Sequence, residues 1–182
     1  QLLMFGGVNG NGVDGGTWTW DGVAWQQLAP AQKPSARYGA SLVYDAGRSQ
    51  VLLFGGFAAS RRNDTWLWNG ATWTQVLPAT VPPVRDCGGI AYDAANDEVV
   101  LYGGYGSGIL GDTWTWDGTT WTQATPATTP GPRECPGLAY DVPRAEVVLF
   151  GGPGPGAADE TWIWDGTNWV ERITANAPSP RF

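Results

Sequence analysis

Histidine is absent from this chain of 182 residues. Without an imidazole the chain cannot build a Ser-His-Asp triad or a histidine-ligated metal centre, which excludes most hydrolases and most transition-metal enzymes. Charged residues make up only 15% of the chain, and the acidic ones outnumber the basic ones to give a net charge of −7. That balance disfavours nucleic acids and anionic membrane surfaces as partners.

Long hydrophobic runs are also missing. The apolar stretch at residues 51–54 is typical of the longest runs, whereas spanning a bilayer takes about 20 apolar residues, so no membrane insertion is expected. The chain is instead rich in glycine, with 27 residues, and in tryptophan, with 12. This composition disfavours a helical protein and predicts an all-β fold.

The tryptophans reveal an internal repeat of 48 residues. They fall into three series with this spacing, which account for all 12. The series are Trp18, Trp66, Trp114 and Trp162; Trp20, Trp68, Trp116 and Trp164; and Trp25, Trp73, Trp121 and Trp169. We therefore expect four repeat units in a single domain of residues 1–182, at about 1–37, 38–85, 86–133 and 134–182.

Each unit reads as four short strands, which we expect at residues 42–45, 51–54, 65–68 and 73–75 of the second copy. The second strand is continuously apolar and ends at a double glycine, as is typical of a buried strand that ends in a turn with positive φ. The third strand alternates Trp with other residues and runs into Asn69-Gly70, which is a hairpin signal. Because such units carry large apolar groups on both faces, they must stack, and a ring of blades is the favoured arrangement.

The order of these features resembles the kelch repeat. The resemblance rests on Phe54-Gly55-Gly56, on Asn63-Asp64-Thr65-Trp66 and on Trp73, which recur together over essentially the whole chain. It implies a kelch-type β-propeller whose four-stranded antiparallel blades have the first strand innermost. Two departures are that the first copy has Gly15-Gly16 in place of Asn63-Asp64, and that no unit has the histidine often found at its start.

One innermost strand is missing from the four units. The last three strands of the unit occur four times, but the first occurs only three times, and the absent stretch corresponds to residues 39–49 of the second copy. Since kelch propellers usually have six or seven blades, we expect a segment of a larger ring or, alternatively, an eight-bladed homodimer. Either arrangement requires self-association or further blades to cover the outer apolar faces.

The loops between the second and third strands are the first candidate binding surface. They occupy residues 8–16, 57–63, 105–111 and 153–159 and differ most among the copies. We expect apolar and basic anchors there, and the candidates are Phe57, Arg61, Arg62, Tyr105, Ile109 and Leu110. The alternative is that these glycine-rich loops are simply solvated connections.

Four arginines at 48-residue intervals are a second candidate: Arg37, Arg85, Arg133 and Arg181. Near a central channel they would form a ring able to bind a carboxylate or sulfate. In kelch-like units, however, this arginine is often structural and bonds backbone carbonyls or an acidic neighbour. Asp86 and Glu134 directly follow two of them and form a possible acid and base pair on neighbouring blades.

The two cysteines occupy equivalent positions in adjacent units, at Cys87 and Cys135. They should be neighbours, but the spacing of inner strands is borderline for a disulfide, so we expect two buried thiols. With no histidine and no third cysteine, no metal site or cofactor is expected. The copper site of galactose oxidase, an enzyme with kelch-type blades that uses His and Tyr ligands, has no equivalent in this sequence.

Two function classes follow from these observations. The first is a non-enzymatic scaffold that binds a protein or a polysaccharide through the loops on one face, and we favour it by analogy with the fold. The second is a sugar-handling enzyme of the isomerase or hydrolase type with its site at the channel mouth. The acidic, lysine-poor composition suggests an extracellular or cell-surface protein of bacterial type. We expect the tryptophans to serve inter-blade packing rather than sugar stacking.

Overall fold

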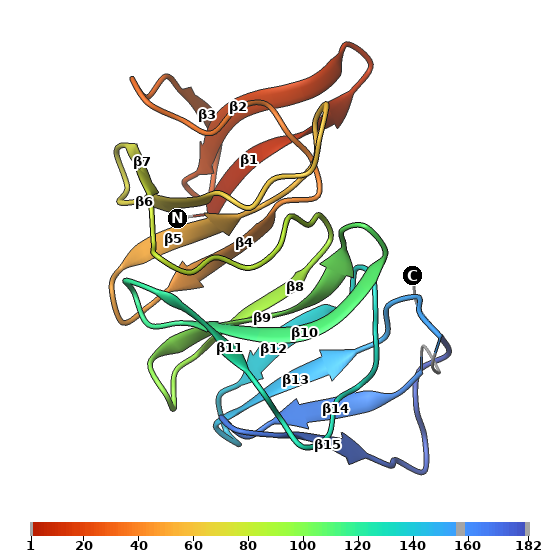
Figure 1. Cartoon of the computed structure of the whole chain (residues 1–182). Helices are drawn as coiled ribbons and strands as arrows, with labels where there is room; N and C mark the ends of the chain where they lie inside the picture. Colours follow the sequence, from red (N-terminus) through yellow and green to blue (C-terminus); the bar gives the residue numbers. More distant parts are fainter. Residues whose placement is uncertain (1, 156–158, 181–182) are drawn as a thin grey trace.

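A computed structural model of the chain describes residues 2–155 and 159–180. The described residues form β-strands and no helix, which confirms the predicted all-β class. None of them belongs to a helix long and apolar enough to cross a membrane. Figure 1 shows four twisted antiparallel sheets side by side in chain order, from red to blue, like consecutive blades of a propeller.

Each blade is built from strands that are consecutive in the chain. Blade 1 consists of β1 (Leu2–Asn9), β2 (Gly12–Trp20) and β3 (Trp25–Leu28). Blade 2 consists of β4 (Ser41–Asp45), β5 (Gln50–Phe54), β6 (Thr65–Trp68) and β7 (Trp73–Val76). Blade 3 consists of β8 (Gly89–Asp93), β9 (Glu98–Tyr105), β10 (Ile109–Trp116) and β11 (Trp121–Ala124). Blade 4 consists of β12 (Gly137–Asp141), β13 (Glu146–Phe150), β14 (Thr161–Trp164) and β15 (Trp169–Arg172).

The first strand of each complete blade lies next to its counterpart in the neighbouring blade. Strand β8 contacts β4 on one side and β12 on the other, which places these three strands innermost. Just before these strands, a backbone chain of hydrogen bonds passes from blade to blade: Cys87 N–H donates to the Gly39 carbonyl, and Cys135 N–H donates to the Cys87 carbonyl, both at 2.8 Å. The inner strands therefore form one continuous surface.

Blade 1 lacks its innermost strand, as the repeat predicts. Strand β1 pairs with β2 along one edge, in the way that β5 pairs with β6. The other edge of β5 is occupied by β4, whereas no strand among the described residues pairs with the corresponding edge of β1. The outer blades 1 and 4 lie at opposite ends of the array in Figure 1.

The double glycine that ends the second strand is required by both its conformation and its surroundings. Gly55 and Gly56 have φ values of +67° and +99°, which confirms the predicted positive-φ turn. A Cβ atom on Gly55 would lie 2.5 Å from the Arg85 carbonyl oxygen. The glycines thus admit the backbone of the link that leads to the next blade.

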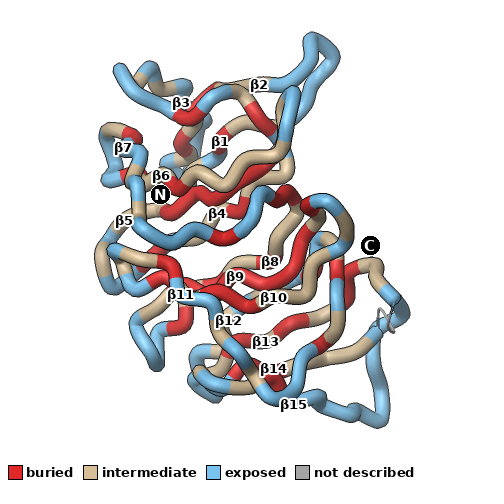
Figure 2. Tube along the Cα trace, in the orientation of Figure 1, coloured by how far each residue is buried: buried red, intermediate tan, exposed pale blue. Residues whose placement is uncertain are grey.

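The core lies between the blades rather than within them, because each of the three clusters of buried apolar side chains combines residues of two neighbouring blades. Figure 2 shows the buried residues in red mainly along the strands and the exposed residues in pale blue mainly in the connections. At each of the three interfaces an aromatic ring of one blade contacts the outer-strand tryptophan of the next. The pairs are Phe5 with Trp73, Phe54 with Trp121 and Tyr102 with Trp169, with ring centroids 5.1 to 5.4 Å apart. These three indoles are 0 to 1% exposed, as expected for inter-blade packing.

Two of the predicted loops are largely strands. Strand β1 runs to Asn9 and β2 begins at Gly12, and β9 runs to Tyr105 while β10 begins at Ile109, so the candidates Ile109 and Leu110 lie on a strand. The expected loops 8–16 and 105–111 are thereby shortened. Register shifts near the glycines allow the strand pairing to resume beyond the Gly-Gly turn. The backbone N–H and C=O groups of these segments are therefore hydrogen-bonded within a two-stranded ribbon.

Candidate interaction face

The loop face is the end of the blades that carries the connections between second and third strands together with the links that lead into the inner strands. Because the strands are antiparallel, both kinds of connection emerge at the same end. Within the described residues these are segments 10–11, 55–64, 106–108 and 151–160, without 156–158, and links 29–40, 77–88 and 125–136. Residues 156–158 of the fourth expected loop lie outside the described part of the chain, as does Arg181.

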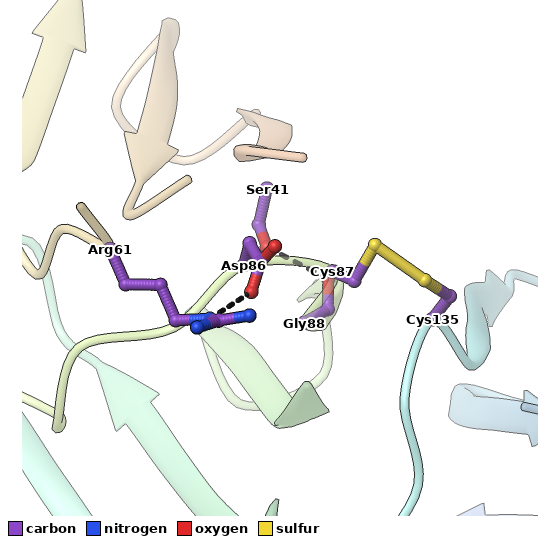
Figure 3. Close-up of a disulfide and its surroundings, with 6 residues drawn as sticks. All are labelled: Ser41, Arg61, Asp86, Cys87, Gly88 and Cys135. Atoms are coloured by element: carbon purple, nitrogen blue, oxygen red, sulfur yellow. Dashed lines mark hydrogen bonds and ion pairs between the residues drawn. A yellow bond between two sulfur atoms is a disulfide. The ribbon is translucent and has the colours of Figure 1, made fainter. Parts of the chain in front are cut away.

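Arg61 forms the centre of a cluster on the loop face. Its Nε donates to Asp86 Oδ1 at 2.6 Å, as Figure 3 shows, and its guanidinium carbon lies 4.5 Å from the centroid of the Tyr105 ring and 5.3 Å from that of Phe57. The ion pair with Asp86 and the cation–π contact with Tyr105 join the loop of blade 2 to the link before blade 3 and to the end of β9, whereas the contact with Phe57 lies within the blade 2 loop. The predicted anchors Phe57, Arg61 and Tyr105 are thus brought together.

Tyr38, which the sequence pattern did not single out, extends this cluster. Its ring centroid lies 5.5 Å from that of Phe57, and the two backbones exchange hydrogen bonds. Tyr38 remains 38% exposed, so it presents an aromatic surface beside Phe57. The signal for it was its position immediately after Arg37, where the link enters the inner strand.

The remaining loop candidates are placed differently. Ile109 is partly exposed at the tip of the β9–β10 ribbon. Arg62 and Leu110 occupy equivalent positions, and their carbonyls accept hydrogen bonds from the backbone N–H groups of Arg85 and Arg133. The backbones of these two residues therefore help to hold the inter-blade links.

The three described arginines of the 48-residue series are buried and hold neighbouring blades together through ion pairs. Arg37, Arg85 and Arg133 are 1 to 2% exposed. The Arg85 guanidinium donates to the Gly103 carbonyl at 2.9 Å and to both Asp112 oxygens at 2.8 and 2.7 Å, all in the next blade. The Arg37 guanidinium likewise donates to the Gly55 carbonyl and the Asp64 carboxylate. The Arg133 guanidinium donates to the Gly151 carbonyl and the Glu160 carboxylate. These contacts fit the structural alternative rather than an anion-binding ring.

Two of the carboxylates in these ion pairs, Asp64 and Asp112, have lowered pKa values that favour the ionised form. Burial by itself would raise the pKa of Asp64, but the hydrogen bonds from Arg37 and Trp66 and the positive charge of Arg37 outweigh burial, so the pKa is lowered. Burial likewise opposes the lowering of the Asp112 pKa, which the hydrogen bond and charge of Arg85 and the Trp114 indole produce. The perturbed carboxylates on this side of the molecule are therefore engaged in inter-blade ion pairs.

The proposed acid and base pair is not freely available for proton transfer. The Asp86 carboxylate is bound by Arg61 and is only 9% exposed as a residue. Glu134 is half-buried and lies next to the two cysteine sulfurs. A general acid or base must reach a substrate proton, and Asp86 would first have to release Arg61.

The cysteines form a disulfide, which corrects the expectation of two buried thiols. Cys87 and Cys135 are joined across blades 3 and 4, with their Cα atoms 4.5 Å apart (Figure 3). The hydrogen bond between the same two backbones brings them closer than the spacing of inner strands suggested. A disulfide is compatible with an oxidising extracellular environment.

Cys87, Cys135 and Glu134 place their ligand atoms within 4.8 Å of one another, the spacing of a metal site. Metal ions bind thiolates, and both sulfurs here are engaged in the disulfide. The residues as they stand therefore form a covalent link between blades rather than a metal centre.

Removing this disulfide is expected to lower the free energy of unfolding by about 3 to 4 kcal/mol, because the bond closes a loop of 48 residues in the unfolded chain. The measurement is urea unfolding of the Cys87→Ser/Cys135→Ser variant beside the oxidised wild-type chain. A reduced wild-type sample is the control and should show the same loss. Full reactivity of both cysteines with a thiol reagent in the untreated native protein would contradict the disulfide.

A concave surface that was not predicted from the sequence lies along the inner strands. Strands β4, β8 and β12 line a depression of about 540 Å³ with apolar side chains and with Tyr44, Tyr92 and Tyr140. The 48-residue spacing of these tyrosines was the available signal. The hydroxyl of Tyr92 donates to Asp97 Oδ1 at 2.7 Å. This hydrogen bond, with a smaller contribution from burial, raises the pKa of Tyr92.

Comparisons with known proteins leave the assignment to the residues themselves. A scan against protein-family models finds no match, and a search of curated proteins finds none either.

Proposed function

We propose that this chain is a non-enzymatic recognition scaffold, a kelch-type propeller unit that binds a protein partner through its loop face outside the cell. The observation that carries the proposal is the cluster of Tyr38, Phe57, Arg61 and Tyr105, which brings together side chains from two neighbouring blades. Arginine and tyrosine, together with tryptophan, are enriched in the energetically important centres of protein interfaces.

The same cluster favours a protein over a polysaccharide. A sugar ring stacks on a free aromatic face, but in this cluster the Arg61 guanidinium lies over the rings of both Phe57 and Tyr105. The mixed surface of guanidinium and ring edges suits polypeptide carbonyls and apolar side chains. Fixing Arg61 by its ion pair with Asp86 also reduces the side-chain entropy lost on binding.

The proposal is tested by selecting binders from a phage-displayed peptide library on the immobilised chain and measuring the affinity of the selected peptides. The Arg61→Ala and Tyr38→Ala variants should each weaken binding by at least about tenfold, the scale of an interface hot spot. Val142→Ala is the control, because this residue is 75% exposed in the turn between β12 and β13, at the opposite end of the blades.

Two results would contradict the proposal. One is selected peptides whose affinity is unchanged by Arg61→Ala and Tyr38→Ala. The other is strong binding on a glycan array, or turnover of a sugar substrate, without peptide binding, which would favour the polysaccharide or enzyme alternatives.

A further inference from the structure

The three internal blade interfaces use one contact set three times. In each, the indole of the outer-strand tryptophan lies against an aromatic ring of the preceding blade and donates its N–H to a threonine hydroxyl there. The donors Trp73, Trp121 and Trp169 reach Thr17, Thr65 and Thr113 at 3.1, 2.9 and 2.9 Å. These threonines are 0 to 1% exposed, so the hydrogen bond is fully buried at every interface.

One half of this contact set is uncovered at the N-terminal end of the array. Trp25 is the fourth tryptophan of the series, and it is 46% exposed, whereas its three counterparts are 0 to 1% exposed. On the same blade Leu2 and Met4 are 54% and 44% exposed, although Leu53, the counterpart of Met4, is completely buried. We call these three residues, Leu2, Met4 and Trp25, the N-terminal face.

The complementary half is uncovered at the C-terminal end. Phe150 and Thr161 of blade 4 are the counterparts of Phe54 and Thr65, and both are only half-buried. Val148, the counterpart of the fully buried Leu52 and Val100, is half-buried too. Phe150 and Val148 line an apolar depression of about 390 Å³. We call Val148, Phe150 and Thr161 the C-terminal face.

We propose that a second copy of this chain docks its N-terminal face onto the C-terminal face of the first, with Trp25 against Phe150 and its indole N–H directed to the Thr161 hydroxyl. The chain already forms this interface three times, between its own consecutive blades. Each face is the missing half of that interface, so the partner that fits it best is another blade of the same repeat. This inference is independent of the binding activity proposed for the loop face.

The pairing is head-to-tail, because the two faces differ. Each copy therefore offers one tryptophan donor and one threonine acceptor. Two copies use both donors and both acceptors only when the N-terminal face of each meets the C-terminal face of the other. This asymmetry gives a test that an ordinary two-fold interface would fail. A variant that damages one face still carries the other face intact.

The experiment is sedimentation velocity on the whole chain at about 1 to 100 µM, a range that brackets micromolar affinity. The wild-type chain should sediment with at least twice the mass of one chain at the upper concentrations. Trp25→Ala and Phe150→Arg should each sediment as single chains. Leu77→Ala is the control, because that side chain is 87% exposed in the link after β7, outside both terminal faces, and its replacement should leave the association unchanged.

Mixing the two damaged variants is the decisive step. The Trp25→Ala chain keeps its C-terminal face and the Phe150→Arg chain keeps its N-terminal face, so the mixture should associate although neither variant does so alone. Thr161→Val keeps the shape but removes the hydrogen-bond acceptor, and should weaken association about three- to tenfold. Near-ultraviolet circular dichroism verifies that each variant is folded.

Three results would overturn the proposal: a wild-type chain that remains single at 100 µM, an association that survives both Trp25→Ala and Phe150→Arg, or a mixture of folded variants that stays unassociated.

Discussion

Replacing Trp121 with alanine is expected to lower the free energy of unfolding by about 3 to 5 kcal/mol. The side chain is 1% exposed, and its ring lies against Phe54 of the preceding blade with centroids 5.1 Å apart. Truncation would leave a large cavity between blades 2 and 3. It would also leave the buried Thr65 hydroxyl without the indole N–H that it accepts at 2.9 Å.

Trp25→Ala is the matched control for this prediction. Trp25 occupies the same position in the repeat but is 46% exposed, so the same truncation removes far less buried contact. Both variants are measured by urea unfolding at a concentration low enough that the copies are separate. An equal loss of stability in the two variants would show that burial between blades does not decide the role of this tryptophan.

Much of the fold was predictable because the same pattern of tryptophans and glycines, with the same packing requirements, occurs four times in the sequence. The spacing of the tryptophans predicted the blades, and the double glycines predicted the positive-φ turns at Gly55 and Gly56. Even the absent inner strand of blade 1 follows from counting strands. Repetition makes such inferences strong, since a packing position that recurs at fixed spacing must fit the same neighbour each time.

The candidate site was less predictable because it depends on contacts between blades. The sequence indicated that Phe57, Arg61 and Tyr105 lie at one end of the molecule, but their stacking requires the relative position of two blades. The disulfide was misjudged for the same reason. Whether Cys87 and Cys135 can bond depends on how closely two inner strands approach at their first residues.

Replacing Arg85 with methionine is the second change with a large expected effect, a loss of about 3 to 5 kcal/mol. Its guanidinium is 1% exposed and binds the Asp112 carboxylate and the Gly103 carbonyl of blade 3. Its own carbonyl accepts a hydrogen bond from Gly56 of blade 2 at 2.8 Å. Arg85 therefore ties the two blades together, blade 3 through its side chain and blade 2 through its backbone, and removing the side chain leaves Asp112 without its cation.

Two further variants separate the ion pair from general packing. Arg144→Met is the matched control, because Arg144 also pairs with an aspartate, Asp141, but its side chain is 69% exposed, and we expect no measurable change. Adding Asp112→Asn to Arg85→Met should restore part of the lost stability, since the amide needs no cation and can still accept from the Trp114 indole. Additive losses in the double variant would contradict a coupled pair.

The pH dependence of the same variant identifies the carboxylate involved. Burial opposes the shift, but the hydrogen bond and charge of Arg85 lower the pKa of Asp112 below its ordinary value of 3.8 in the folded protein. A lowered folded-state pKa contributes stability that is fully present above the ordinary value and is lost as the pH falls through the folded-state value. The stability difference between wild type and Arg85→Met should therefore be largest near neutral pH and shrink on acidification below about pH 4. A stability difference that stayed constant to low pH would mean that the Arg85 side chain acts through its hydrogen bond to the Gly103 carbonyl and through packing, rather than through the ionised carboxylate of Asp112.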